Sequence, residues 1–284
     1  MREFEALAGL TSDPGLRIPI TMCHGIRPGG ERPLTVEHLD RLVGIAAEMG
    51  FESIGYDQLA AWRDDAGVLP ERPIMFDFDH PVRSMGYEVR EVLARYGYTG
   101  NLFVYTGPLD PTWTGPQPGT SDTDDLLTWD ELGELIEAGW GIGAHTSSHP
   151  DLSALSVEDP SGEKLREELD RCNDAIERNL GFFPKDFAFT STTWSSAAEA
   201  EVMKRYRFGR LWIIGAEYTA DGKPIRYADL AGVPGPDEAD GGPPSAARYI
   251  TRESHPYRLP SMELQQLVHE PAAFHGYLEG ALAG

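Results

Sequence analysis

The chain has 284 residues, of which 40% are hydrophobic and 25% charged, as is ordinary for a soluble globular protein. It carries 24 Lys and Arg against 46 Asp and Glu, so its formal net charge is −22. This charge repels nucleic acid and anionic membrane surfaces, and we expect neither as a partner. A neutral or cationic ligand suits it better.

The sequence contains no signal that would place the chain in a membrane. No stretch approaches the roughly 18 consecutive apolar residues that a membrane span needs. The first residues, MREFEALAGLTSDPG, lack the basic region and the apolar region of a signal peptide. The two cysteines, Cys23 and Cys172, could form a single disulfide, but two reduced thiols are the default. We therefore expect a cytoplasmic protein.

Short apolar, β-rich runs alternate with longer amphipathic runs along most of the chain. Strands are predicted near 18–23, 51–54, 73–79, 101–105, 140–144, 186–190 and 208–214. Helices are predicted at 36–49, 56–65, 83–96, 129–138, 163–180 and 195–206. This alternation indicates an α/β fold with a mostly parallel sheet, either doubly wound or an incomplete (β/α) barrel. In both folds the functional site lies at the carboxyl ends of the strands.

Two long segments, 106–127 and 215–257, interrupt the alternation and are rich in Gly, Pro and Asp. The second contains GVPGPDEADGGPPSAAR, which is typical of a mobile surface segment or lid. Long loops often carry substrate contacts, and disorder is an equal alternative. We predict that residues 1–284 form a single domain that includes both loops.

The residues with the clearest chemistry follow two predicted strands. The run IMFDFDH (74–80) contains Asp77 and Asp79, which are two positions apart and therefore share one face of a strand. His145 and His149 have a spacing that lets two imidazoles reach one metal ion. Asp79 and the two histidines would leave positions open for water and substrate, as in catalytic metal sites. Asp77 could then accept a proton from the water.

The order of these features resembles the NodB-type polysaccharide deacetylases, carbohydrate esterase family 4. More narrowly, it resembles the branch with circularly permuted motifs, as in the exported poly-N-acetylglucosamine deacetylases. The matching segments are IPITMCHGI (18–26), LTVEHLDRLVGIAAEMGFESIGYDQL (34–59), LPERPIMFDFDH (69–80), VLARYGYTGNLFVYTG (92–107), LTWDELGELIEAGWGIGAHTSSHPDLSALS (127–156) and LDRCNDAIERNLGFFPKDFAF (169–189). The similarity covers about 18–214, with a weaker match at RLPSMEL (258–264). It implies a distorted (β/α)7–8 barrel of the NodB-homology type.

The resemblance also implies roles for five residues. Asp77 falls on the catalytic base of the family, and Asp79, His145 and His149 fall on its metal ligands. His24 falls on the histidine that protonates the leaving amine in the permuted branch. From the residues alone, a satisfied core histidine is the more common interpretation of His24. In the family, metal-bound water attacks an N-acetyl carbonyl, and the amide breaks to give an amine and acetate.

The chain departs from the family at three places. The family motif Phe-Asp-Asp-Gly is here Phe-Asp-Phe-Asp-His, so a different register would put Phe78 at the metal position. Strand alternation favours Asp79 as the ligand. His80 has no family counterpart and could be an extra ligand, a substrate contact or an exposed residue.

The other two departures affect the expected wall of the groove. The family segment Phe-Ala-Tyr-Pro-Tyr-Gly, which donates an N–H to the oxyanion, is replaced by FAFTST at 187–192. At 259–262, Leu-Pro-Arg-Ile becomes LPSM, so an arginine expected near the base is missing, and Arg258 is a candidate replacement. Changes in the wall, with the ligands retained, indicate an altered substrate rather than lost chemistry.

We therefore expect a metal-dependent N-deacetylase or amidohydrolase that acts on linear amides. It would remove an acyl group, acetyl first of all, from an amine on a small metabolite or amino sugar. The alternatives are hydrolysis of another C–N bond, such as that of a cyclic imide or formamide, or a catalytically inactive binding module. Zn²⁺ is the first expectation for the metal, and Co²⁺, Ni²⁺ and Mn²⁺ suit the same ligands. The sequence does not indicate an oligomeric state.

Overall fold

The computed structural model describes residues 10–115, 125–215 and 217–283. Its main sheet has the strand order β12-β2-β5-β6-β7-β8-β9, and the pairs from β2 to β9 are parallel. These strands are β2 Ile18–Cys23, β5 Pro73–Asp79, β6 Asn101–Val104, β7 Gly141–Ala144, β8 Asp186–Ala188, β9 Phe208–Arg210 and β12 Tyr249–Ile250. The strands predicted from the sequence agree with β2 and β5 to β9 within a few residues.

The sheet is so strongly curved that the strands β2 and β9, which are far apart in the strand order, approach each other. β13, Met262–Glu263, pairs in parallel with β2, and isolated bridges join Arg210 to Leu259 and Ile213 to Met262. The segment 259–263 therefore lies between β9 and β2. This arrangement is the distorted (β/α) barrel that the resemblance implied.

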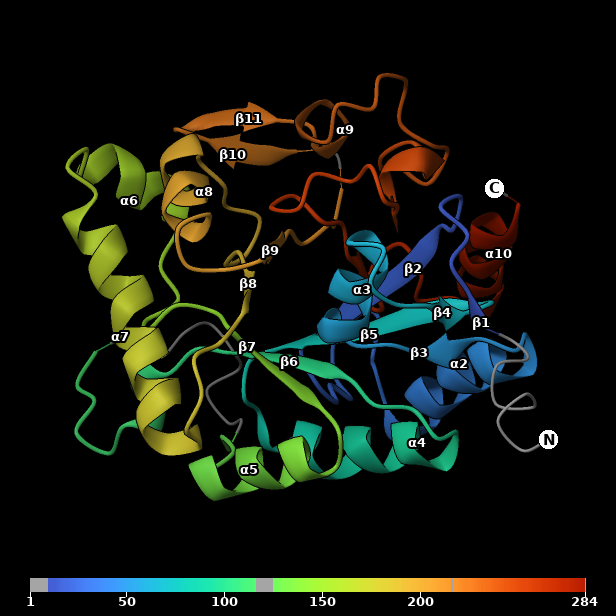
Figure 1. Cartoon of the computed structure of the whole chain (residues 1–284), viewed down its shortest axis with the longest axis horizontal. Helices are drawn as coiled ribbons and strands as arrows, with labels where there is room; N and C mark the ends of the chain where they lie inside the picture. Colours follow the sequence, from blue (N-terminus) through green and yellow to red (C-terminus); the bar gives the residue numbers. More distant parts are fainter. Residues whose placement is uncertain (1–9, 116–124, 216, 284) are drawn as a thin grey trace.

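Helices surround the sheet, with α7 along one side, α5 and α4 along another, and α2 packed against α10 (Figure 1). The helices are α2 Val36–Glu48, α3 Tyr56–Arg63, α4 Arg90–Arg95, α5 Trp129–Glu137, α6 Leu152–Glu158, α7 Glu163–Leu180, α8 Ser196–Val202, α9 Tyr227–Leu230 and α10 Pro271–Leu282. Three further helical segments are the π-helical η1 Met85–Val89 and the 3₁₀ turns η2 Gly107–Leu109 and η3 Ser245–Ala247. None of the helices in the described ranges has the length and hydrophobicity of a membrane span.

Local signals explain where the longer helices begin and end. The Thr35 side chain accepts a hydrogen bond from the backbone N–H of His38, and so caps the start of α2. Gly181 ends α7 in the left-handed conformation, with φ of 80°, which glycine adopts without a steric penalty. The helix predicted at 83–96 forms as η1 followed by α4, so its first turns are wider than those of an α-helix.

The segment 215–257, expected as a loop, is built from short elements in its described part. It contains the hairpin of β10 (Tyr218–Ala220) and β11 (Lys223–Ile225), followed by α9, η3 and β12. Its tyrosines Tyr218, Tyr227 and Tyr249 are almost completely buried. The segment is thus not a plain loop, because these aromatic residues anchor its Gly- and Pro-rich chain to the core. In the loop expected at 106–127, residues 116–124 lie outside the described ranges.

The remaining strands are short and flank the main sheet. They are β1 Leu10–Thr11, β3 Glu52–Ser53 and β4 Leu69–Pro70. β3 pairs with β5, and β1 pairs with β4 in a separate two-stranded sheet.

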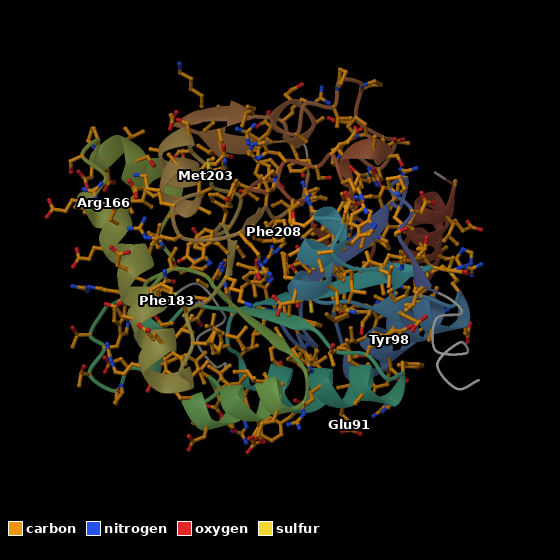
Figure 2. The ribbon with its side chains drawn as sticks, viewed as in Figure 1. Glu91, Tyr98, Arg166, Phe183, Met203 and Phe208 are labelled. Carbon is orange, nitrogen blue, oxygen red and sulfur yellow. The ribbon has the colours of Figure 1, made fainter. Side chains whose placement is uncertain are left out.

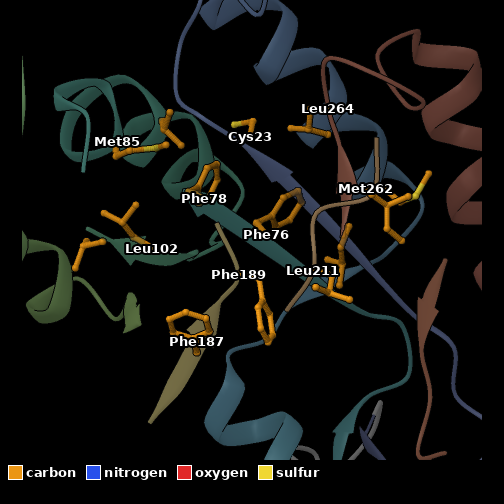
Figure 3. Packing of buried hydrophobic residues seen from close by; sticks show 14 of the residues in the cluster. Cys23, Phe76, Phe78, Met85, Leu102, Phe187, Phe189, Leu211, Met262 and Leu264 are labelled. Carbon is orange, nitrogen blue, oxygen red and sulfur yellow. The ribbon is translucent and has the colours of Figure 1, made fainter. Parts of the chain in front are cut away.

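Two apolar clusters follow from the alternation of side chains along the strands. The larger one lies between the sheet and the outer helices and contains Phe76, Phe78 and Phe187, with Phe189 at an edge-to-face distance of 5.3 Å from Phe187 (Figure 3). The smaller one fills the barrel interior and includes Ile20, Met75, Phe103 and Phe208. Figure 2 shows Phe208 inside the molecule, while Glu91 and Arg166 lie at its periphery. The inward faces of the strands therefore lead through an apolar interior to the carboxyl ends, where the polar residues gather.

Candidate metal centre

Three histidines meet at the carboxyl ends of the parallel strands. His80 follows β5, and His145 and His149 belong to the loop after β7. One ring nitrogen from each can be chosen so that all three lie within 4.8 Å of one another. No other group of three or more His, Cys, Asp or Glu side chains in the described ranges has this geometry. The predicted ligands His145 and His149 are thus brought together, and His80 joins them.

The ring of His145 is oriented by a backbone carbonyl. Its Nδ1 lies 2.8 Å from the carbonyl oxygen of Ala188, which fixes Nδ1 as the donor and leaves the Nε2 lone pair free. That Nε2 is buried and has no hydrogen-bond partner. An imidazole that donates Nδ1–H to a carbonyl and presents Nε2 to a site is the usual arrangement of a metal-binding histidine.

The loops that carry the histidines adopt unusual backbone conformations. His80, Thr146 and His149 all have positive φ, at 72°, 67° and 58°, and so does Ser191 in the neighbouring loop after β8, at 52°. Such conformations cost roughly 1–3 kcal/mol each and cluster at functional sites. The loop after β7 is also tied to α7, because Glu168 accepts hydrogen bonds from the backbone N–H groups of Ser147 (3.1 Å) and Ser148 (2.7 Å). The two-histidine loop is therefore held rigidly in a strained shape.

Burial keeps the three imidazoles neutral. It lowers the pKa of His145 and of His149 to about 3, and the guanidinium of Arg210 contributes to the shift of His145. The pKa of His80 also lies well below its ordinary value, first because of burial and then because of His24 and the other two histidines. Neutral imidazole is the form that binds metal ions.

A buried arginine lies next to the histidines and holds both predicted carboxylates. Arg210, at the end of β9, forms an ion pair with Asp79 through Nη2, and its Nε lies 3.2 Å from Oδ2 of Asp77. Arg210 and Asp77 are completely buried, and Asp79 is 2% exposed. Arg210 was not predicted as a site residue from the sequence. The only feature that could have indicated it is the presence of a charged residue within the otherwise apolar strand segment FGRLW.

The two carboxylates occupy successive levels of the barrel interior. Asp77 is the deeper one: it accepts hydrogen bonds from Tyr56 Oη (2.6 Å) and Asn101 Nδ2 (3.0 Å). Burial, only partly offset by Arg210, raises the pKa of Asp77 to about 7. Both carboxylate oxygens of Asp77 therefore accept hydrogen bonds from residues other than the three histidines. Asp79 lies nearer to them, but the structure gathers His80, not Asp79, with His145 and His149.

The arginine expected in the segment 259–262 is supplied by a different strand. Arg210 forms a β-bridge with Leu259, and its Nη1 donates to Ser261 Oγ at 3.2 Å. The candidate replacement Arg258 instead forms an ion pair with Glu199, with Nε 2.6 Å from Oε2. Arg210 therefore lies beside the carboxylates, where an arginine was expected from the segment 259–262.

A cleft of about 300 Å³ opens in front of two of the histidines. It is lined by His24, Arg27, His80, His149, Ser191, Trp212, Glu263, Gln265 and Gln266. The ring of His24 lies 4.7 Å from that of His80, and its Nδ1 lies 3.5 Å from Oε1 of Glu263. Trp212 donates its Nε1–H to the same carboxylate at 3.1 Å. The predicted acid His24 is thus at the cleft, whereas Asp77, Asp79 and His145 are not among its lining residues.

A cavity of about 380 Å³ lies at the opposite, amino-terminal ends of the strands. Its charged lining residues pair with one another: Arg207 binds Asp57 and Asp186, each at 2.7 Å. This cavity contains none of the histidines. We therefore place the candidate site at the cleft that contains His24, His80 and His149.

Comparison with known proteins agrees with the fold. The polysaccharide deacetylase family matches residues 66–208, about half of the chain, and the chain belongs to this family. The family resemblance expected from the sequence is thereby confirmed, and it indicates a hydrolytic deacetylase. No curated protein matches the chain.

Several solved structures share the fold. The Streptococcus pyogenes deacetylase PplD, in complex with acetate, aligns with a TM-score of 0.67 at 13% identity, over 93% of this chain and 98% of its own. IcaB from Ammonifex degensii aligns with a TM-score of 0.64 at 13% identity, over 94% and 97%. The BpsB deacetylase domain from Bordetella bronchiseptica aligns with a TM-score of 0.61 at 16% identity, over 88% and 96%. At these identities the similarity establishes the NodB-type barrel.

Proposed function

We propose that this protein is a metal-dependent hydrolase that removes an acyl group from an amine on a small metabolite or amino sugar. One observation carries the proposal: ring nitrogens of three neutral histidines, two of them buried and His149 partly buried, lie within 4.8 Å of one another beside a cleft and a carboxylate–arginine pair. Structural metal sites are closed by four protein ligands, so a group of three leaves a position for water and substrate.

The donor set fits a divalent transition metal. His145 and His149 would hold it, with a third protein ligand from β5 or the residue after it. Zn²⁺ is our first choice, and Co²⁺, Ni²⁺ or Mn²⁺ suit imidazole ligands as well. When bound, the metal supplies Lewis acidity toward the acyl carbonyl and lowers the pKa of water to ~7. The unpartnered Nε2 of His145 supports this fit, because a buried ring nitrogen without a partner is rare in a purely structural histidine.

The proton transfers fall to residues around the cleft. One of the two carboxylates on Arg210 would accept a proton as base: either Asp77, to which the sequence assigns this role, or Asp79, which the sequence assigns to the metal. His24 would protonate the departing amine, since it lines the cleft and lies next to His80. Glu263 would orient His24 through its Nδ1, which leaves Nε2 for the substrate.

The cleft favours a small substrate. Its volume of about 300 Å³ is at the lower end of ligand pockets, and Trp212 offers an apolar face for a sugar ring. A neighbouring depression of about 650 Å³ shares Arg27, Glu263, Gln265 and Gln266 with it, so a longer substrate would extend in that direction. Acetyl is the acyl group we would test first, because PplD is described with acetate bound. The two free, buried cysteines support our proposal of a cytoplasmic location.

The test is a substrate panel with the metal-loaded full chain. N-Acetylglucosamine, its short oligomers, N-acetylated small amines, a cyclic imide and a formamide are incubated with the protein, and released amine and acetate are quantified. Release from an N-acetylated compound, lost in His149→Ala, supports the proposal. Turnover of the imide or formamide alone points to a different C–N hydrolase. No turnover of any compound by a metal-loaded protein that still binds them points to a binding module.

A further inference from the structure

We propose that His80 is the third protein ligand of the metal, so that this chain has an all-histidine site in which Asp79 is not a ligand. The inference rests on the proposed function and concerns the same site. It changes the assignment made from the sequence, which gave the third position to Asp79 on the basis of strand alternation. Three observations on the chain's own residues carry it.

The first observation is the distance between the rings. Nε2 of His80 lies 3.1 Å from Nε2 of His149. Two nitrogens bound at ~2.0–2.1 Å to one tetrahedral zinc lie roughly 3.3 Å apart. The rings of His80 and His149, and those of His145 and His149, both have centroids 4.8 Å apart. The His80–His149 pair is thus already at the spacing of two ligands, and His145 lies within 4.8 Å of both, so small side-chain shifts would bring all three to one ion.

The second observation is the conformation of the residue. If the strand continued regularly, His80 would face the outer helices, as Phe78 does, on the side opposite to Asp79. The φ of 72° breaks that alternation directly after β5, while the backbone N–H of His80 still bonds to the carbonyl of Phe103 at 3.0 Å. Left-handed backbone is unfavourable for a non-glycine residue because its Cβ approaches the carbonyl oxygen. Here it turns the imidazole toward His145 and His149.

The third observation is that Asp79 already has a strong partner. Its carboxylate is paired with the fully buried guanidinium of Arg210. Recruiting Asp79 to a metal would weaken this pair and leave Arg210 with Asp77 alone. His80 has no charged partner of this kind in the described residues: its Nδ1 is buried without a hydrogen bond, and its Nε2 is at hydrogen-bond distance from the other proposed ligand His149.

Together these observations support a third way to align residues 74–80 with the family motif Phe-Asp-Asp-Gly. Phe78-Asp79-His80 corresponds to the Phe-Asp-Asp of the family, with histidine in place of the second aspartate. Asp79 then becomes the carboxylate that Arg210 positions next to the metal, and it is the better placed of the two carboxylates to serve as base. Asp77 belongs to a deeper layer, where Tyr56 and Asn101 bind it.

The experiment counts histidine ligands in the wild-type chain. Metal-free protein, prepared with a chelator and uniformly labelled with ¹⁵N-histidine, is loaded with Co²⁺. The shifted signals of the metal-bound rings are then recorded by NMR. We expect shifted signals from three histidines. Signals from two histidines, with one Co²⁺ per chain, would overturn the inference and leave the proposed function intact. Failure to bind any metal would instead reject the proposed function itself.

Four variants provide an independent test by calorimetric titration with Zn²⁺. His80→Ala is expected to weaken binding as much as His149→Ala, and by more than the ~10–100-fold that loss of an outer partner costs. Asp79→Asn should weaken it far less, and His275→Ala, at an exposed residue of α10, should leave it unchanged. The reverse order, with Asp79→Asn matching His149→Ala, contradicts the inference.

A fifth variant addresses folding. His80→Asp keeps a ligand of the family type at this position, so we expect it to bind one metal per chain with a native circular dichroism spectrum. Tight binding by both His80→Ala and His80→Asp would show that residue 80 is not a ligand.

Discussion

Arg210 and Asp79, 131 positions apart in the sequence, form an ion pair that is buried from solvent immediately beside the histidine group. The same guanidinium reaches Asp77, one level deeper in the barrel. Two carboxylates therefore share one cation, and the pair closest to the histidines is the one with Asp79. This relationship determines which carboxylate is held in place for chemistry and which belongs to the interior.

Removing the cation should destabilise the fold. Arg210→Met leaves Asp77 and Asp79 buried together without a counter-charge, and we expect the free energy of unfolding to fall by ~3–5 kcal/mol. Urea denaturation followed by circular dichroism measures the change. Arg95→Met, at an exposed surface pair, is the matched control and should not shift the midpoint. Adding Asp79→Asn to Arg210→Met should restore part of the loss, and no recovery would argue against the pairing.

The two carboxylates should differ in their effect on turnover. Asp79→Asn is expected to lower kcat by ~10²–10⁴, the usual contribution of a positioned base, while Asp77→Asn retains a larger share of the activity. The reason is that both Asp77 oxygens are bound by Tyr56 and Asn101, whereas Asp79 lies two residues further along β5, next to His80. Steady-state kinetics on the best substrate of the panel give both values. If Asp77→Asn is the more damaged variant, the base is Asp77, as the sequence alone suggested.

His24 should matter for the leaving group and not for the metal. We expect His24→Gln to bind one metal per chain and to lose ~10²–10⁴ in kcat on an unactivated amide, because the amine must be protonated to leave. An activated aryl ester, whose leaving group needs no proton, should be hydrolysed at nearly the wild-type rate. An equal loss on both substrates would mean that His24 has a structural role.

The two cysteines should be inert in the folded protein. Burial raises the pKa of Cys23 and that of Cys172 to about 12, so both remain thiols at neutral pH, and the thiolate is the form that reacts. Ellman's reagent at pH 8 should label neither residue before unfolding and both after denaturation. Rapid labelling of the native protein would contradict their burial, and the absence of labelling in denaturant would indicate a disulfide.

The strand–helix alternation could be predicted from the sequence because each element is long enough to show its own periodicity. α7 is an example: the predicted helix and the observed one both run from Glu163 to Leu180. The elements of 215–257 could not be predicted in the same way. Its strands and helix have two to four residues each, too few to show a period, and the anchoring tyrosines are separated by Gly- and Pro-rich chain.

The site was predictable only in part. His145 and His149 show their role through spacing, and Asp77 and Asp79 through alternation on a strand. The position of His80 could not be predicted in this way, because its left-handed backbone reverses the face on which its side chain lies. Sequence periodicity does not indicate such a reversal. Arg210 could not be predicted either, because its partners come from a distant strand, and the closing contact with Leu259 arises only when the sheet curls into a barrel.

Metal content tests the central claim most directly. The full chain is loaded with Zn²⁺ and passed over a desalting column, and elemental mass spectrometry is used to compare the wild type with a His145→Ala/His149→Ala double variant. The account predicts about one zinc per wild-type chain and none in a variant that still folds. Equal zinc in both, or none in the wild type after loading, would show that the histidine group is not a metal centre.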